Sequence, residues 1–188
     1  MKALLTTSAV AVLVLATGSA ADGHQTRAEA ATAAPCTGQI HPNAGFEHGT
    51  TGWTAGPRIV VLADQSRPAH TGRAYATFAG LDLTHTDLLR GSVTVPAGCD
   101  LTLGFWARVT TTETTRGDYL NVGLSITGTP PKTIFPLSFD HSPEWQQHTS
   151  RTGTATTERT ATVSFYASET AGNGVTAFDV DDVTFTLS

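Results

Sequence analysis

Residues 101–109, which read Leu-Thr-Leu-Gly-Phe-Trp-Ala-Arg-Val, decide the fold, because apolar side chains occupy every second position. A period of two places successive side chains on opposite faces of an extended strand, whereas a helical pattern repeats every 3.6 residues or so. Residues 119–126 and 162–167 show the same alternation. Further strands are predicted for residues 58–62, 74–79, 88–95, 133–139 and 145–150, and for a C-terminal run over residues 178–187.

Turn-forming residues separate these runs, as in residues 96–98 (Pro-Ala-Gly) and 171–174 (Ala-Gly-Asn-Gly). No segment from Gly45 onward has the helical period. About nine short strands of this kind are typical of an all-β, antiparallel β-sandwich with a jelly-roll arrangement. Because neither an internal repeat nor an interdomain linker interrupts them, we expect a single domain over residues 36–188.

Residues 1–21 have the layout of a secretory signal peptide. A short positive region, Met1-Lys2, precedes an apolar stretch that runs to Ala16, and small residues suited to a signal peptidase end at Ala21. A membrane anchor is the alternative, but the apolar run of about 14 residues is shorter than the roughly 18 to 20 that span a bilayer. We therefore expect a secreted, extracellular protein with no membrane span in the mature chain, and a flexible leader over residues 22–35.

The composition argues against several function classes. The 188 residues include 11 Lys+Arg and 16 Asp+Glu, which gives a formal net charge of −5, and 39% of them are hydrophobic. Nucleic-acid binding needs clustered basic side chains, and the only lysines are Lys2 and Lys132. The hydrophobic fraction and the modest charge also disfavour intrinsic disorder. We expect a folded domain that does not bind nucleic acid.

Cys36 and Cys99 are the only two cysteines. In an oxidising compartment, two cysteines most simply pair with each other. A disulfide between them would close a loop of about 63 residues, for which the chain-entropy model gives roughly 4 kcal/mol of stabilisation. A catalytic cysteine would need a histidine partner and would forgo the disulfide, so we favour the disulfide.

The parity of the apolar residues changes within the C-terminal strand. Phe178 and Val180 share one face, whereas Val183 has the opposite parity, so a β-bulge or twist is expected across Asp181-Asp182. In phase with Phe178 and Val180, Asp182 would point inward, where a carboxylate needs a cation or several hydrogen-bond donors. Two interpretations stay open, a metal ligand and a surface pair at a kink in the strand.

Aromatic and polar side chains on the outward parity suggest a binding surface. Flat aromatic rings stack on the faces of sugars, while arginine and asparagine offer directional hydrogen bonds to hydroxyl groups. If the neighbouring leucines face the core, the outer sheet face carries Trp106, Arg108, Tyr119, Asn121 and Tyr166. The alternative is that a loop or the N-terminal segment covers Trp106. We expect Trp53 and Trp145 to be core or corner residues.

Sequence motifs for catalysis are absent. The chain has no nucleophile elbow, no His-Glu-x-x-His, no glycine-rich phosphate loop and no Cys-x-x-Cys. Asp181 and Asp182 are adjacent and would face opposite sides of a regular strand, which makes them a poor pair for glycoside hydrolysis. A Ser/His/Asp set assembled only in space stays open, but we expect no enzyme. His85 and Asp87 would share one strand face, either as a polar hook for a ligand hydroxyl or as a pair that orders a loop.

Four short motifs resemble those of galactose-binding-like jelly rolls, a group that includes carbohydrate-binding modules attached to secreted polysaccharide hydrolases. The motifs are residues 43–47 (Asn-Ala-Gly-Phe-Glu), 52–54 (Gly-Trp-Thr), 69–75 (Ala-His-Thr-Gly-Arg-Ala-Tyr) and 178–183 (Phe-Asp-Val-Asp-Asp-Val). The resemblance covers about residues 36–188 and implies the galactose-binding-like fold. It does not carry a ligand with it, because one fold hosts many functions.

The same resemblance implies a structural calcium ion. In such jelly rolls the ion is commonly held by the Glu of the first motif, by loop carbonyls and by an Asp of the last strand. Carried over to this sequence, the ligands are Glu47, the backbone near His70 and Gly72, and Asp182, with Asp181 as the alternative. Hard oxygen ligands of this kind suit calcium. The ion would hold the two chain ends together rather than catalyse a reaction.

A second likeness lies in the middle of the chain. Residues 85–87, 93–99, 103–106 and 112–115 resemble a domain at the C-terminal end of secreted actinobacterial peptidases. That domain has cysteines at the two positions found here, which supports the disulfide between Cys36 and Cys99.

Two functional hypotheses follow. The leading one is a secreted, non-catalytic β-sandwich that binds a polysaccharide or glycan and contains a structural calcium ion. The alternative is a protein-interaction module that is related to the peptidase-appended domain and associates with a secreted or cell-wall protein without a catalytic domain of its own.

Overall fold

The computed structural model describes residues 36–138 and 141–188, all of which belong to one compact unit, Ala33–Ser188. The expected signal peptide (1–21) and leader (22–35) lie outside the described residues. Within the described part every regular element is a β-strand, and all strand pairs are antiparallel. No helix in this part of the chain is long and apolar enough to cross a membrane.

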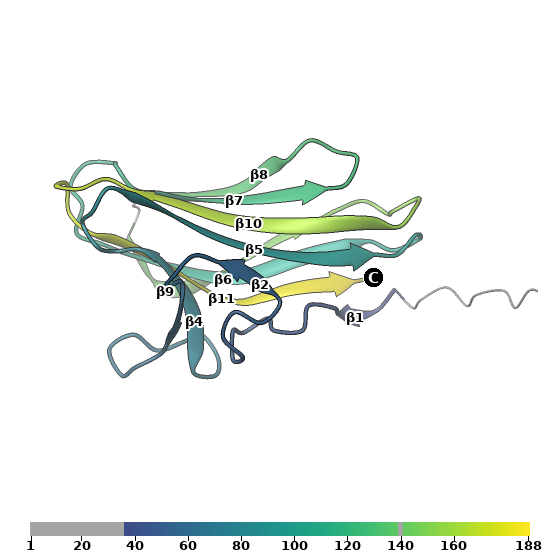
Figure 1. The fold of residues 1–188 in the computed structure, drawn as a ribbon, viewed down its shortest axis with the longest axis horizontal. Coiled ribbons are helices and arrows are strands. Elements are labelled where there is room, and N and C mark those ends of the chain that lie inside the picture. The colour runs from purple at the N-terminus through teal and green to yellow at the C-terminus, as the bar shows by residue number, and fades with distance from the viewer. Residues whose placement is uncertain (1–35, 139–140) are drawn as a thin grey trace, which may run out of the picture. The chain divides into compact units, whose positions relative to one another are not determined.

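The strands form two sheets that stack face to face (Figure 1). Sheet A has the order β3 (Val60–Leu62), β4 (Ala74–Ala79), β11 (Thr176–Leu187), β6 (Leu101–Thr111) and β9 (Ser142–Arg151), and β1 (Gly38–Gln39) pairs with the end of β11. Sheet B has the order β2 (Trp53–Ala55), β5 (His85–Val95), β10 (Arg159–Glu169), β7 (Tyr119–Ile126) and β8 (Lys132–Ser138). The expected all-β antiparallel sandwich is confirmed.

Most of the expected strands are present with small changes in their ends. The run predicted at 58–62 starts later, at Val60, because Arg58 has a positive φ of 65° that an extended strand does not allow. Phe139, the predicted last residue of β8, lies outside the described residues. The sequence did not predict β1 and β2, which have two and three residues and are too short for an alternating pattern.

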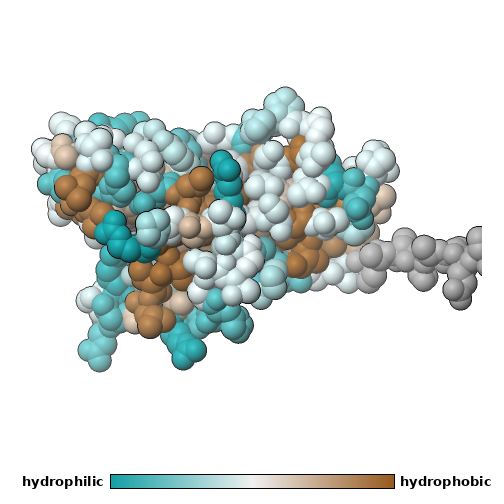
Figure 2. All heavy atoms as spheres, in the orientation of Figure 1, coloured by the Kyte–Doolittle hydropathy of each residue, from teal (hydrophilic) through white to brown (hydrophobic). Residues whose placement is uncertain are grey.

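The alternating apolar residues fill the space between the sheets, as the period of two predicts. Phe78 and Phe105 come from sheet A, and both contact Phe165 of sheet B, at ring-centroid distances of 6.1 and 5.4 Å. All three rings are buried. Figure 2 shows mostly white and teal residues with separate brown patches between them on the face in view. The polar side chains of these strands therefore face outward, and burial of the apolar set holds the sheets together.

The parity change in β11 is a β-bulge, as expected. Pairing with β6 shifts between Asp181 and Thr184, and Asp182 has a positive φ of 47°. The expectation that Asp182 points inward is wrong, because the bulge adds one residue to the strand and returns Val183 to the core without turning Asp182 into it. Asp181 is the buried carboxylate, and it lies on the outer side of sheet A beneath the loop between β3 and β4 (residues 63–73).

The disulfide between Cys36 and Cys99 is confirmed. Cys99 is fully buried in the loop that follows β5, while Cys36 lies just before β1. The bond therefore fixes the first described residue to the body of the sandwich, next to the end of β11.

Candidate functional site

The structure divides the expected five-residue binding surface between two sheets. Trp106 and Arg108 lie on β6 in sheet A, whereas Tyr119 and Asn121 lie on β7, and Tyr166 lies on β10, in sheet B. Each side chain does have the outward parity, but the outer faces of the two sheets are opposite sides of the sandwich. The prediction of a single outer face is wrong, because alternation shows which side of its own strand a residue occupies and not which sheet the strand joins.

A loop covers Trp106, which was the alternative left open by the sequence. The imidazole of His70, in the β3–β4 loop, stacks on the Trp106 indole with ring centroids 3.9 Å apart. The backbone N–H groups of His70 and Thr71 donate hydrogen bonds of 2.9 and 3.1 Å to the Asp181 carboxylate. The loop is therefore fastened across this part of sheet A, and one ring face of Trp106 is not free to stack on a ligand.

Arg108 is buried at the centre of the same face. Its Nε donates to Asp179 at 2.8 Å, and its guanidinium lies 4.5 Å from the Trp145 ring and 5.5 Å from the Tyr75 ring. Trp145 was expected to be a core or corner residue, and it is not in the core, since it lies half-buried on this outer face against Arg108. Trp53, by contrast, is in the core as expected.

The outer face of sheet B keeps its aromatic side chains exposed. Tyr119 and Tyr166 are 38% and 39% exposed, and their ring centroids are 6.4 Å apart. Asn121 stands directly opposite Tyr166 in the pairing of β7 with β10. On the other side of β10, Arg90 of β5 pairs with Ser164, two residues from Tyr166, and is exposed. These four side chains, Arg90, Tyr119, Asn121 and Tyr166, are called the tyrosine face below.

The tyrosine face has the properties of a shallow polar and aromatic platform. Two neighbouring rings can stack on the apolar side of a flat ligand, and the amide and guanidinium groups beside them can donate hydrogen bonds. Among the described residues no acidic side chain pairs with Arg90, so its guanidinium is available to a ligand. Arg90 was not among the residues expected at the binding surface, although its position between Leu89 and Gly91 in the alternating run gives it the outward parity.

The residues predicted to hold a metal converge on the β3–β4 loop. Glu47 accepts hydrogen bonds from the N–H groups of Arg73 and Ala74, at 2.9 and 3.0 Å. Asp182 contacts the His70 imidazole at 2.6 Å. Within the described residues, no three His, Cys, Asp or Glu side chains form a group that could hold a metal by themselves.

Asp181 is buried in the same region, and within residues 36–138 and 141–188 no cationic side chain pairs with it. Burial raises the pKa of Asp181 to about 7, and the hydrogen bonds from the N–H groups of Asp182, Thr71 and His70 only partly oppose this. Both carboxylate oxygens of Asp181 accept backbone hydrogen bonds. The sequence pattern predicted that Asp182 is the buried carboxylate, whereas the buried one is its neighbour Asp181.

The side chains of His85 and Asp87 contact each other and neighbouring residues of the protein. The imidazole Nε2 lies 3.2 Å from the Asp87 carboxylate, and Nδ1 lies 2.7 Å from the Leu83 carbonyl. Glu169, also next to this imidazole, accepts hydrogen bonds from the backbone N–H of Leu81. These contacts order the loop between β4 and β5, which agrees with the second of the two interpretations left open for the pair.

Comparison with known proteins identifies the fold. No protein-family model and no curated protein matches the chain. Among solved structures, the carbohydrate-binding module TmCBM61 in complex with β-1,4-galactotriose is 25% identical, covers 80% of this chain and 97% of its own, and has a TM-score of 0.57. A family 16 carbohydrate-binding module is 17% identical, with coverages of 78% and 98% and a TM-score of 0.51.

A third similar structure is the K3 cleaved adhesin domain of Lys-gingipain from Porphyromonas gingivalis w83, at 15% identity, with coverages of 80% and 98% and a TM-score of 0.51. The chain thus has the galactose-binding-like jelly-roll fold of carbohydrate-binding modules, as the resemblance of its motifs implied.

Proposed function

We propose that the protein is a secreted, non-catalytic module that binds a polysaccharide through the tyrosine face of sheet B. The observation that carries the proposal is the pair of adjacent, exposed rings of Tyr119 and Tyr166, beside the free polar groups of Asn121 and Arg90. The likeness to TmCBM61, whose structure contains β-1,4-galactotriose, supports a carbohydrate ligand. The N-terminal signal-like sequence and the disulfide support secretion.

Binding would follow from the shape of this face. The apolar side of a pyranose ring lies against a tyrosine ring, while its hydroxyl groups face Asn121 and Arg90. An open face buries less of a sugar than a deep pocket does, so each contact is weak and exchange is fast. Several sugar units along one chain would contact both rings, which favours a polysaccharide over a single sugar.

Substitution of the two tyrosines tests this proposal. Tyr166→Ala and Tyr119→Ala are expected to abolish retardation in native gels that contain a soluble polysaccharide, with β-1,4-galactan and xylan as the first probes. Tyr166→Phe keeps the ring and should keep most of the binding. Because both side chains are exposed, the melting temperatures should change little. Unchanged retardation of a well-folded double alanine variant would overturn the assignment of this face.

A calcium ion at the β3–β4 loop is proposed as the structural partner of the fold. The carboxylates of Glu47 and Asp182 face this loop from the two ends of the chain, and the loop backbone near His70 and Gly72 could supply further oxygen atoms. Hard oxygen ligands from side chains and carbonyls are the set that calcium takes. Asp181 is fully buried, whereas the Asp182 side chain is 23% exposed, which favours Asp182 as the ligand.

Calcium titration provides the test. We expect calorimetry to show one bound ion in the wild type and none in Glu47→Gln, and we expect a strong chelator to lower the melting temperature of the wild type only. Asp64→Asn is the matched control, because Asp64 lies in the same loop and bonds only to Ser66 and Arg67 beside it. A melt that a chelator leaves unchanged, in protein shown beforehand to be calcium-loaded, would contradict the proposal.

A further inference from the structure

Two adjoining cavities lie along the outer side of β4, away from the tyrosine face. The larger has a volume of about 360 Å³ and the smaller about 200 Å³, and both are lined by Arg67 and Gly80. The larger cavity also has Arg108 in its wall, and the smaller has Arg58. The two cavities together are called the arginine groove.

The larger cavity carries an excess of positive charge. Arg67 and Arg108 are the only charged residues in its wall, and both bind one carboxylate, that of Asp179, at 2.5 and 2.8 Å. One negative charge thus faces two positive ones. Arg108 is only 8% exposed, and its Nη2 is buried with no hydrogen-bond partner in the part of the chain that the structure describes. The Arg67 side chain is 42% exposed, so its guanidinium is the one that an anionic group entering the cavity can reach, while buried Arg108 adds positive charge behind it.

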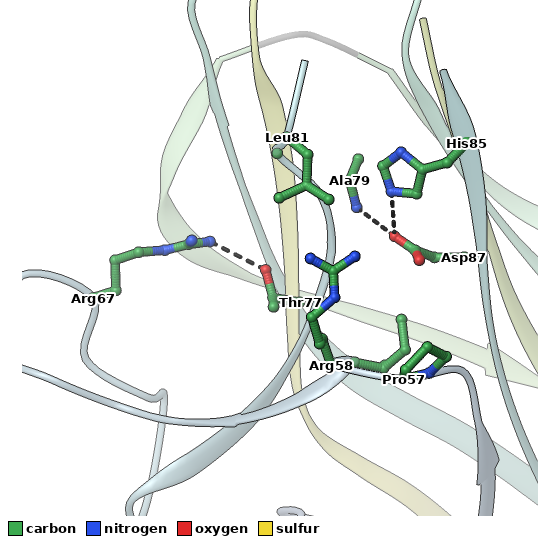
Figure 3. A pocket seen from close by; sticks show the side chains of 10 residues that line it. Pro57, Arg58, Arg67, Thr77, Ala79, Leu81, His85 and Asp87 are labelled. Carbon is green, nitrogen blue, oxygen red and sulfur yellow. Dashed lines mark hydrogen bonds and ion pairs between the residues drawn. The ribbon is translucent and has the colours of Figure 1, made fainter. Parts of the chain in front are cut away.

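The smaller cavity adds a second free guanidinium. Figure 3 shows the Arg58 guanidinium extending into the space between Thr77 and Asp87. Among the described residues Arg58 has no acidic partner. The Asp87 carboxylate nearby already accepts from the Ala79 N–H and contacts His85. Arg58 also has a positive φ of 65°, an unusual conformation for a residue other than glycine, and such positions are common at ligand-binding sites.

The cavities between the arginines are larger than a small inorganic ion needs and have both polar and apolar walls. Thr110 is an exposed residue that lines the larger cavity, and Leu81, 40% exposed, lines the smaller one. A volume of about 360 Å³ lies within the range of pockets that hold small organic ligands and far exceeds the space that a single anion needs. Guanidinium groups bind carboxylates with paired hydrogen bonds.

We propose that the arginine groove binds an acidic polysaccharide, with one uronic acid unit in each cavity. The carboxylate of the unit in the larger cavity pairs with the exposed part of the Arg67 guanidinium, and the carboxylate of the next unit pairs with Arg58. Arg67, between the two cavities, borders both units. The proposal does not depend on the tyrosine face, which lies on the other sheet and is suited to neutral sugars.

Calorimetric titration of the full secreted protein with tri-galacturonate tests the proposal, with galactotriose as the uncharged counterpart. Arg58→Gln is expected to weaken binding of tri-galacturonate about tenfold, the loss typical of one charge-assisted hydrogen bond. Thr110→Trp fills the larger cavity from an exposed position and should abolish binding of tri-galacturonate. Lys132→Gln removes an exposed basic side chain from β8 of sheet B, outside both proposed sites, and should leave the affinity unchanged.

The alternatives give different results. Equal affinity for galactotriose in the Tyr119→Ala/Tyr166→Ala variant, in which the tyrosine face is removed, would overturn the proposal. So would an unchanged affinity for tri-galacturonate in Thr110→Trp. Equal affinity for tri-glutamate would also overturn it, in favour of an acidic peptide. Tyr166→Ala should bind tri-galacturonate as the wild type does. This result separates the proposal for the arginine groove from the proposal for the tyrosine face. Melting curves of each variant confirm that the protein is folded.

Discussion

The imidazole of His70 stacks on the indole of Trp106, with the ring centroids 3.9 Å apart and the ring planes inclined by 18°. His70 belongs to the loop between β3 and β4, and Trp106 belongs to the middle of β6. The contact therefore joins a loop to the outer face of sheet A, at a place where hydrogen bonds from the loop backbone to Asp181 do the same. An aromatic residue with the outward parity of a binding platform thus acts as an anchor for a loop.

Trp106→Ala is expected to destabilise the protein without affecting polysaccharide binding at the tyrosine face. Loss of the stacked ring removes one of the contacts that hold the β3–β4 loop, so the free energy of unfolding should fall by about 1–3 kcal/mol. Denaturant unfolding measures this loss, and retardation in polysaccharide gels should match that of the wild type. If Trp106→Ala kept the stability of the wild type but lost polysaccharide binding, Trp106 would instead be part of the binding surface.

Gly72→Ala should cost more stability than Gly49→Ala. Both glycines have a positive φ, 65° at Gly72 and 62° at Gly49, so alanine at either position carries the same conformational cost of about 1 kcal/mol. A Cβ at Gly72 would also overlap the Glu47 carboxylate, whereas nothing lies within 4 Å of a Cβ at Gly49. The difference between the two variants, measured by thermal or denaturant unfolding, reports how tightly Glu47 holds the loop. Equal losses would show that Glu47 moves aside freely.

Removal of the disulfide should lower the free energy of unfolding by about 4 kcal/mol. Cys36 and Cys99 are separated by 63 residues, and the chain-entropy model assigns a loss of this size to a loop of that length. The double variant Cys36→Ala/Cys99→Ala and the wild type with reductant should unfold at similar denaturant concentrations. If the double variant were as stable as the oxidised wild type, the N-terminal segment would be held by β1 pairing alone.

The stability contributed by His41 should disappear at acid pH. Burial lowers the pKa of His41 below its usual 6.5, against the opposing effect of its hydrogen bonds with Gly52 and Asn43. The neutral ring donates from Nε2 to the Gly52 carbonyl at 3.1 Å and accepts from the Asn43 N–H at 3.3 Å. The folded state disfavours the proton, so the contribution is complete above about pH 6.5 and is lost as the pH falls below it. An NMR titration of the ring checks the direction of the shift.

His85 should titrate in the opposite direction and provides the control. Burial alone would lower the pKa of His85, but the Leu83 carbonyl and the carboxylates of Asp87 and Glu169 outweigh it, and the pKa is raised. Its contribution is therefore present below about pH 6.5 and is lost as the pH rises through the raised value. His85→Gln removes this opposing contribution, so the loss of stability on acidification should become steeper. A shallower loss in that variant would contradict the assignment.

Part of the candidate site could be predicted from local pattern alone. The ends of β4 and β7 agree with the predicted runs at 74–79 and 119–126, and the outward parity of Tyr119, Asn121 and Tyr166 is correct. This is possible because the direction of a side chain on a strand depends only on its immediate neighbours. Arg90 follows the same rule and could have been found in the same way.

The arginine groove could not have been predicted, because its members lie far apart in the sequence. Arg58 and Arg67 lie in loops, Arg108 lies in β6, and Asp179 near the end of the chain joins two of them. Loop residues follow no repeating pattern, and the pairing of β11 with both β4 and β6 is decided by contacts across the whole domain. Only the folded chain brings these charges together.

By itself, the sequence determined the strand content, the antiparallel sandwich, the pairing of the two cysteines and the position of the bulge in β11. All of these follow from local alternation or from having only two cysteines. The tertiary structure alone decided that Trp106 and Tyr166 lie on opposite sides of the molecule and that Asp181, not Asp182, is buried. The physical reason is that partner choice between strands and the path of a loop depend on the sum of many distant contacts, which no short stretch of sequence records.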